Sequence, residues 1–416
     1  MRRYIASAFL LMVIILAAAI VLNVLIDPYA IHDSTRHAGI NLEKPALSAN
    51  ERLYKAQLAQ TAATTVILGT SRSEVGIDPT SPAFGAGPII NLATSNQPYR
   101  ETLELLQVAS ARGVRRAIVG LDFFAANDWR RYPSTYSPGM YAGINRWELA
   151  ASMSTLLASY NTVRNQDPHR LAAVGAQLRE DGMRLLGDGY ISGQGGHYRL
   201  FLDTETSYLR DAYPQHNAFG LDLSDGGTSE MKCALRLFEY AHQHGIELHV
   251  FISPSHAQLW ETLYQSGLWD KWEAWKRRLV AMGQLAAREA GTSPFDIVDF
   301  SGFNAFTTEP VPPQSQPSAR MQWYIEASHY RPALGELVLE RLLTRTSTDH
   351  RAADFGTSID TTNIDGSLSD IRASHTRWRA ANPTAVDDIA AALSRSILSR
   401  RRNATVQERF QGQGCS

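Results

Sequence analysis

An uncharged apolar run near the N-terminus constrains this chain more than any other feature of its sequence. Met1-Arg2-Arg3 comes first, and the segment from Tyr4 to Ile26 that follows holds no charged residue. Roughly 20 apolar residues are enough to cross a bilayer as a helix. The run ends at Asp27-Pro28, so we expect residues 1–27 to form a single membrane anchor.

The two arginines predict the orientation of that helix. Basic residues beside a membrane span favour the cytoplasmic side, so Arg2 and Arg3 place the N-terminus in the cytoplasm and the rest of the chain outside it. We therefore expect a single-pass protein of the inner (cytoplasmic) membrane, held through residues 4–26, with a periplasmic C-terminal domain. The alternative is a cleaved signal peptide, whose apolar region is usually shorter and ends in a small-residue cleavage site.

Composition is that of an ordinary globular protein and excludes some partners. Of 416 residues, 44% are hydrophobic and 19% are charged, which is ample for a core. The 40 basic and 41 acidic residues give a net charge of -1, so no global field attracts nucleic acid. The two cysteines and 12 scattered histidines form no metal-ligand pattern, and no glycine-rich nucleotide loop is present. We expect neither metal nor cofactor.

Short apolar runs alternate with helical patterns along most of the chain. The expected strands are 66–69, 89–92, 117–121, 248–252 and 297–300, and the expected helices are 49–61, 99–112, 229–245, 269–290 and 333–343. Strands that alternate with helices at this pitch indicate parallel βαβ units. The fold class is therefore α/β, a three-layer αβα sandwich with a mainly parallel sheet, plus the N-terminal transmembrane helix.

These elements also predict the domain organisation. The expected parts are an anchor (1–27), a linker and helix (28–63), an α/β domain (64–343) with an insertion at about 129–229, a polar helical extension (344–400) and a disordered tail (401–416). Within the extension, 364–378 and 385–398 have amphipathic patterns.

The first strand ends in a turn that carries a hydroxyl group. The β-branched run Thr65-Val66-Ile67-Leu68 leads into Gly69-Thr70-Ser71, which places Ser71 at the tip of a buried strand where a helix begins. A serine in this position is a candidate nucleophile. The alternative is that Ser71 or Ser73 only caps the helix, as serine commonly does.

Far downstream, Glu326-Ala327-Ser328-His329 supplies an acid and a base on one short segment. A serine hydroxyl needs an imidazole to take its proton and a carboxylate to orient that imidazole. We therefore expect Ser71, His329 and Glu326 to meet as nucleophile, general base and orienting acid. The alternative for His329 is a capping histidine before the helix that follows Pro332.

On these two segments the chain resembles the SGNH (GDSL-like) hydrolases. Gly69-Thr70-Ser71 is similar to that family's Gly-Asp-Ser block, with Thr for Asp, and Glu326-x-x-His329 to its Asp-x-x-His block, with Glu for Asp. The resemblance covers roughly residues 64–343 and implies a flavodoxin-like fold. It also places the oxyanion-hole blocks near Asn96 and at Gly120-Leu121-Asp122, where Asp122 stands for an asparagine whose role Asn127 could assume.

Two further residues are candidate substrate contacts. Arg72 adjoins the nucleophile, and His256 follows the fourth strand, at the edge of the sheet where open α/β folds bind ligands. The alternative for His256 is a strand-end histidine bonded to the backbone. Trp269, Trp272 and Trp275 are candidates for stacking on glycan, although spacing on one helix face more often indicates core residues. The better glycan candidates are aromatic residues of the insertion, because loop aromatics need not serve the core; they are Trp129, Tyr132, Tyr136 and Tyr141.

The resemblance and the anchor together imply a function. Membrane-anchored proteins of this family act in cell-envelope polysaccharide acetylation and lipoteichoic-acid alanylation. They imply a serine esterase or O-acyltransferase whose substrate is an acylated glycan or polymer, with a membrane-bound acyltransferase as partner. The alternatives are a non-catalytic envelope protein that binds glycan or assembles a complex, and a scaffold without a ligand site.

Overall fold

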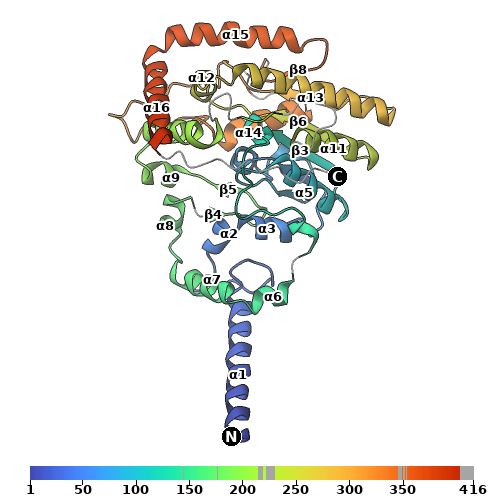
Figure 1. Cartoon of the computed structure of the whole chain (residues 1–416), viewed down its shortest axis with the longest axis vertical. Coiled ribbons are helices and arrows are strands. Elements are labelled where there is room, and N and C mark those ends of the chain that lie inside the picture. The colour runs from blue at the N-terminus through green and yellow to red at the C-terminus, as the bar shows by residue number, and fades with distance from the viewer. Residues whose placement is uncertain are drawn as a thin grey trace.

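The computed structural model describes residues 1–143, 145–175, 177–213, 219–221, 230–344, 349, 352 and 354–402. Helix α1 (Arg2–Ile26) projects from a mixed α/β body (Figure 1). Its side chains are exposed along most of its length, and it is long and apolar enough to cross a membrane. Residues 403–416, which include most of the tail predicted to be disordered, lie outside the described residues.

A six-stranded sheet organises the body, in the order β2-β1-β3-β6-β7-β8. Five strands are parallel, and they are β1 (Thr65–Leu68), β2 (Ile89–Asn91), β3 (Arg116–Leu121), β6 (Glu247–Ile252) and β7 (Ile297–Asp299). Each lies within two residues of its predicted bounds. All of β1 is buried, as expected for a parallel strand covered on both faces.

Helices pack around this sheet in two groups. Those of the first group contact one another and the strands β1 and β6; they are α5 (Tyr99–Ser110), α11 (Glu230–Gln243) and α13 (Trp269–Ala290). Those of the second group contact β1, β3 and each other; they are α4 (Ser71–Gly76) and α14 (Pro332–Leu339). The mixed α/β class and the mostly parallel sheet are confirmed, and the three-layer sandwich stays a prediction.

The polar segment after residue 344 forms two helices and also adds a strand to the sheet. Helices α15 (Ile364–Ala381) and α16 (Pro383–Arg402) correspond to the two predicted amphipathic segments. Before them, β8 (Thr357–Ile359) pairs antiparallel with β7. This strand was not expected, because its polar three-residue sequence has no strand pattern of its own and takes its structure from the edge of β7.

The tryptophans of α13 belong to the core. Trp272 and Trp275 are completely buried, and Trp269 is nearly so. A glycan-stacking platform on these three side chains is therefore wrong, and the core alternative is right. Trp275 donates a hydrogen bond from its indole N–H to the Tyr99 hydroxyl at 3.0 Å, which ties α13 to α5.

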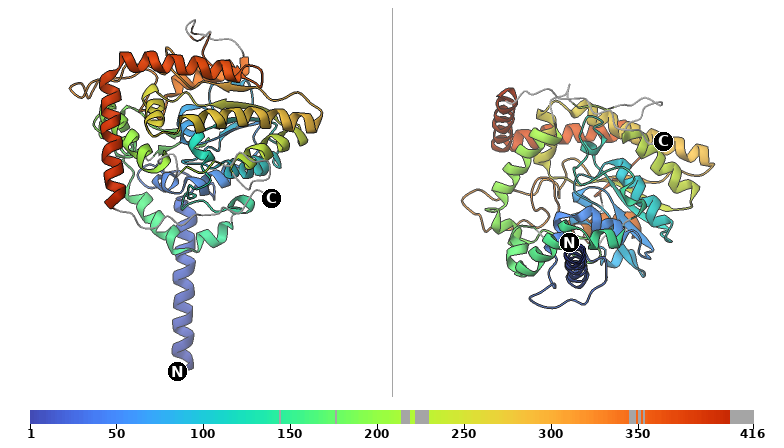
Figure 2. Two further views of the ribbon diagram at one scale, coloured as in Figure 1. Left: turned by 45° about the horizontal axis from the view of Figure 1, so that its top comes forward. Right: turned by 60° about the horizontal axis from the view of Figure 1, so that its bottom comes forward.

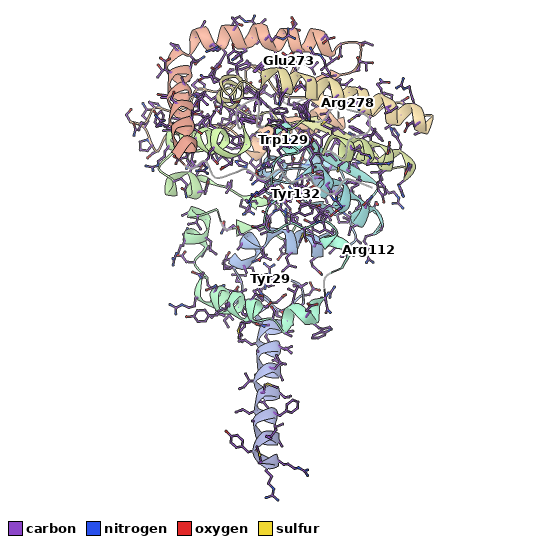
Figure 3. All side chains as sticks on the ribbon, in the orientation of Figure 1. Tyr29, Arg112, Trp129, Tyr132, Glu273 and Arg278 are labelled. Atoms are coloured by element: carbon purple, nitrogen blue, oxygen red, sulfur yellow. The ribbon has the colours of Figure 1, made fainter. Side chains whose placement is uncertain are left out.

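The expected insertion folds into short elements that wrap one side and the base of the body (Figure 2). They are η3 (Met140–Ala142), α6 (Arg146–Ala150), α7 (Met153–Arg164), α8 (Pro168–Ala173), β4 (Gln177–Leu178), β5 (Arg184–Leu185), α9 (Asp188–Gly193), α10 (His197–Ser207) and η4 (Tyr208–Ala212). At its start, Trp129 and Tyr132 lie within the body, well away from α1 (Figure 3). Tyr136 and Tyr141 are buried, so glycan stacking on these two side chains is wrong, whereas Trp129 is 44% exposed.

Candidate active site

The turn from β1 into α4 requires glycine at position 69. Gly69 has φ +131°, a backbone conformation that residues with a side chain rarely adopt. A Cβ atom at this position would lie 2.7 Å from the carbonyl oxygen of Gly120. Thr70 then caps α4, because its Oγ1 accepts the N–H of Arg72 at 3.3 Å. Ser71 is the first residue of α4 and is partly buried. The local sequence thus turns sharply and presents Ser71 at the carboxyl end of β1.

The second segment is a tight turn built around the Glu326 carboxylate. That carboxylate accepts the backbone N–H groups of Ser328 and His329, each at 2.8 Å. It also pairs with Nδ1 of His329. Ile325 donates its N–H to the carbonyl of His329 at 3.0 Å, which closes the turn. The imidazole is therefore held by the acid that stands three residues before it.

The two segments meet as expected. Nε2 of His329 lies 2.8 Å from Oγ of Ser71, and the His329 side chain is 22% exposed. Burial by itself raises the pKa of Glu326, but His329 and the donated hydrogen bonds outweigh it and hold that pKa below its usual range. Glu326 is therefore a carboxylate at neutral pH. It favours the tautomer in which Nδ1 carries the proton and Nε2 faces the serine.

A pocket of about 630 Å³ opens beside Ser71 and His329. It lies between the carboxyl edge of the sheet and the insertion. The other lining residues come from the segment before β1, from α4, from the β2–α5 loop, from the segment that follows β3 and from the insertion. They are Ser48, Ala49, Glu51, Arg52, Val75, Ser95, Asn96, Phe124, Arg130, Pro133, Thr135, Val174, Gly175, Arg184, Leu186, Tyr190, Ser207, Tyr208, Asp211 and Ala212. This volume lies within the range of about 300–1,000 Å³ that is typical of small-molecule binding sites.

Sequence reasoning missed the guanidinium groups of this pocket. Arg52 forms an ion pair with Glu101 at 2.9 Å, and Arg184 pairs with Glu51. Arg130 instead lies over the Phe124 ring, 4.9 Å from its centroid, and no ion pair joins it to a carboxylate of the described residues. A local signal for them is the charged pair Glu51-Arg52 within the expected helix 49–61.

The residues expected to form the oxyanion hole are not placed together. Asn96 is exposed, has φ +59° and lines the pocket with Ser71. Asp122, contrary to expectation, is buried away from the pocket, where its carboxylate binds Arg72 at 2.6 Å and Thr70. Asn127 is also buried, and its Oδ1 accepts N–H groups of Trp129 and Gly220, so it secures a loop instead of facing substrate.

Arg72 does not contact the pocket either, and the prediction of a substrate contact is corrected. Its side chain is 2% exposed. Besides its ion pair with Asp122, its Nε donates to the Ser328 hydroxyl at 3.0 Å, within the turn that carries His329. Arg72 therefore links the end of β3, the start of α4 and the Glu326–His329 turn, which makes it a positioning residue.

His256 takes the structural alternative. It is 2% exposed, its Nδ1 accepts the N–H of Gln258 at the start of α12 (Ala257–Gln265), and its Nε2 donates to the carbonyl of Glu309. Burial lowers the pKa of His256 to about 4. Both ring nitrogens are occupied within the protein, so His256 has no free atom for a substrate.

A second pocket, of about 650 Å³, lies among α12, α13, α15 and α16. Its imidazole, His375, is buried and pairs with Glu261 at 2.6 Å, while Arg372 pairs with Glu273. The guanidinium groups of Arg372 and Arg379 are thus paired with the carboxylates of Glu273 and Glu261. No serine is among the described residues that line this pocket. Across the part of the chain that the structure describes, no group of three or more His, Cys, Asp and Glu side chains could hold a metal ion.

Comparisons with known proteins add no relative to this geometry. No family model matches the chain, and neither a characterised protein nor a solved structure shows a significant match to it.

Proposed function

We propose that this chain is a membrane-anchored serine ester hydrolase or O-acyltransferase with an SGNH-type three-layer fold, which acts outside the cytoplasm on an acylated cell-envelope polysaccharide or similar polymer. One observation carries the proposal. Ser71, His329 and Glu326 form a continuous hydrogen-bonded chain whose serine end opens into a pocket. A serine that only caps a helix, or a histidine that only lies at the surface, would not require this hydrogen-bonded chain beside a pocket.

The chemistry follows from the order of the three groups. Oγ of Ser71 attacks the ester carbonyl as Nε2 of His329 accepts its proton, and Glu326 stabilises the resulting imidazolium. His329 then protonates the departing alcohol, which leaves an acyl group on Ser71. Water completes hydrolysis, and a sugar hydroxyl in the same position completes transfer. The backbone N–H of Ser71 and Asn96, which lines the pocket, are the proposed oxyanion donors.

The anchor supports the proposed location. Helix α1 meets the length and hydropathy of a membrane span, and Arg2 and Arg3 at its start favour a cytoplasmic N-terminus. The catalytic body, which follows α1, then lies on the periplasmic side of the inner membrane. A membrane-bound acyltransferase would be a fitting source of acyl groups for a transferase in this position.

An active-site-directed fluorophosphonate tests the proposal on the full-length protein in detergent micelles. The probe should attach covalently to Ser71, and Ser71→Ala should abolish both labelling and turnover of p-nitrophenyl acetate. Ser73→Ala is the matched control, because Ser73 is completely buried two residues away and its hydroxyl has no hydrogen-bond partner. Absence of labelling in the folded wild type would contradict catalysis and favour an envelope protein that only binds glycan.

A further inference from the structure

Helix α7 has an inverted pattern of burial. Its large apolar side chains point outward: Met153 is 70% exposed, Leu157 59% and Tyr160 57%. The face that it buries is made of small and polar residues, which are Thr155, Ala158, Ser159 and Thr162. A helix at an aqueous surface normally buries its apolar stripe, so the exposed stripe of α7 requires another apolar surface.

The polar face of α7 is fastened to the end of α1. Asn23 is 1% exposed; it accepts a hydrogen bond from Ser159 of α7 at 2.9 Å and donates one to the carbonyl of Ala150, in α6, at 2.8 Å. Tyr29, just beyond α1, is also buried. Both short helices therefore lie crosswise at the base of the body, where α1 emerges (Figures 1 and 2).

Other exposed apolar residues gather at the same place. Trp147 of α6 is 68% exposed, and Ile40 and Leu42 are 45% and 46% exposed. The loop that carries these last two is held to α1, because Asn41 donates to the carbonyls of Leu25 and Ile26. We call α6, α7 and residues 40–42 the collar.

The length of α1 places the collar at a defined depth. The apolar stretch of α1 from Tyr4 to Asn23 rises about 29 Å at 1.5 Å per residue. The hydrocarbon core of a bilayer is about 30 Å thick. When α1 spans that core, Asn23 and the collar reach the boundary between acyl chains and headgroups, where tryptophan and tyrosine are enriched.

We propose that the collar is a membrane-surface docking site, whose exposed apolar side chains enter the outer face of the same bilayer that α1 crosses. An amphipathic helix that lies in the interface buries its apolar face in this way. Arg146 and Arg164, at the two ends of the collar helices, are exposed beside that face and would meet lipid phosphates. The collar then fixes how the body stands on the membrane. This inference rests on the membrane location of α1 and does not depend on catalysis by Ser71.

Photo-crosslinking tests the collar in the full-length protein reconstituted into phosphatidylethanolamine–phosphatidylglycerol nanodiscs. The photoreactive amino acid p-benzoylphenylalanine replaces Tyr160 in one variant and Met153 in a second. The matched control carries it in place of Tyr264, which is 41% exposed on α12, at the end of the body opposite α1 (Figure 1). Circular dichroism verifies that each variant is folded, and mass spectrometry identifies the adducts.

We expect phospholipid adducts at positions 160 and 153 and none above background at position 264. Equal lipid labelling at position 264 would overturn the proposal, as would the absence of lipid adducts at both α7 positions. Crosslinks between two copies of the chain through position 160 would also overturn it, because they would show that another copy covers this face. None of these outcomes changes with Ser71→Ala, so the test is separate from that of the proposed function.

Discussion

Oγ of Ser71 and Nε2 of His329 lie 2.8 Å apart, although 258 residues separate them in the chain. The contact joins the end of the first strand to a turn that follows the fifth parallel strand. Between these points the chain completes the parallel part of the sheet and the whole insertion. The contact between Ser71 and His329 therefore depends on the whole fold. Substitution of residues that position either turn should change the geometry of this contact.

Replacement of Glu326 by glutamine should slow ester turnover sharply. The charge that stabilises the His329 imidazolium is lost, and the imidazole tautomer is no longer fixed, so we expect kcat to fall roughly 10²- to 10⁴-fold. Glu309→Gln is the control, because the Glu309 carboxylate also accepts two backbone N–H groups, from Gln322 and Trp323, without facing Ser71. Hydrolysis of p-nitrophenyl acetate measures both, and an unchanged rate in Glu326→Gln would contradict the assignment.

Asp122→Asn should destabilise the fold and also impair turnover. The substitution leaves the buried Arg72 guanidinium without its anion, and loss of one partner of a buried ion pair costs about 3–5 kcal/mol. Because Arg72 also binds Ser328, the turn that carries His329 loses support and kcat falls. Urea unfolding measures the stability change.

An exposed ion pair provides the comparison for this change. Arg116 and Glu247 lie 3.0 Å apart, and their side chains are 33% and 56% exposed. Glu247→Gln should therefore cost less than about 1 kcal/mol. Equal losses of stability in Asp122→Asn and Glu247→Gln would contradict the larger contribution that we expect from the buried Arg72–Asp122 ion pair.

Gly69→Ala should destabilise the protein more than Gly113→Ala does. Both glycines have positive φ, +131° and +108°, so both substitutions introduce backbone strain of about 1–2 kcal/mol. Only at Gly69 would the new methyl group meet other atoms, Ser73 Oγ at 2.6 Å and the Gly120 oxygen at 2.7 Å; around Gly113 nothing lies within 4 Å. Thermal unfolding compares the two variants, and equal melting temperatures would contradict the crowding.

Local signals explain why the meeting of Ser71, His329 and Glu326 could be predicted from the sequence. The run before Gly69 is β-branched and apolar, so it predicts a buried strand and a sharp turn with Ser71 after it. Glu326 and His329 lie on one turn, where a spacing of three residues is enough to bring acid and base together. Each of these inferences needs only a few neighbouring residues, and the pairing of the two segments follows from chemistry.

Nonlocal contacts explain what the sequence did not reveal. Asp122 meets Arg72 because β1 and β3 are neighbours whose register pairs Leu68 with Val119, and no local pattern contains that register. The resemblance to the SGNH hydrolases placed Asp122 in the oxyanion hole. In the structure its carboxylate instead forms a buried ion pair with the Arg72 guanidinium. The sequence also did not predict that the apolar face of α7 is exposed. Periodicity can identify an apolar stripe on a helix, but it does not show what covers that stripe.

His256 and Glu230 should give protein stability opposite dependences on pH. Burial lowers the pKa of His256 from 6.5 to about 4, so between these values the unfolded chain binds a proton that the folded one does not. Stability from this group is therefore lost as pH falls. Burial raises the pKa of Glu230 from 4.5 to about 7, so the folded chain binds the extra proton and stability is lost as pH rises. Each effect amounts to roughly 3 kcal/mol across its window.

Single substitutions separate the two slopes, which nearly cancel in the wild type between about pH 4.5 and 6.5. His256→Asn keeps a side-chain acceptor for the Gln258 N–H and leaves only the Glu230 slope, so this variant should become less stable as pH rises. Glu230→Gln leaves only the His256 slope and should become more stable as pH rises. Urea unfolding at half-unit pH steps measures both, and parallel curves for the two variants would contradict the opposite titrations, because each variant retains only one of the two groups.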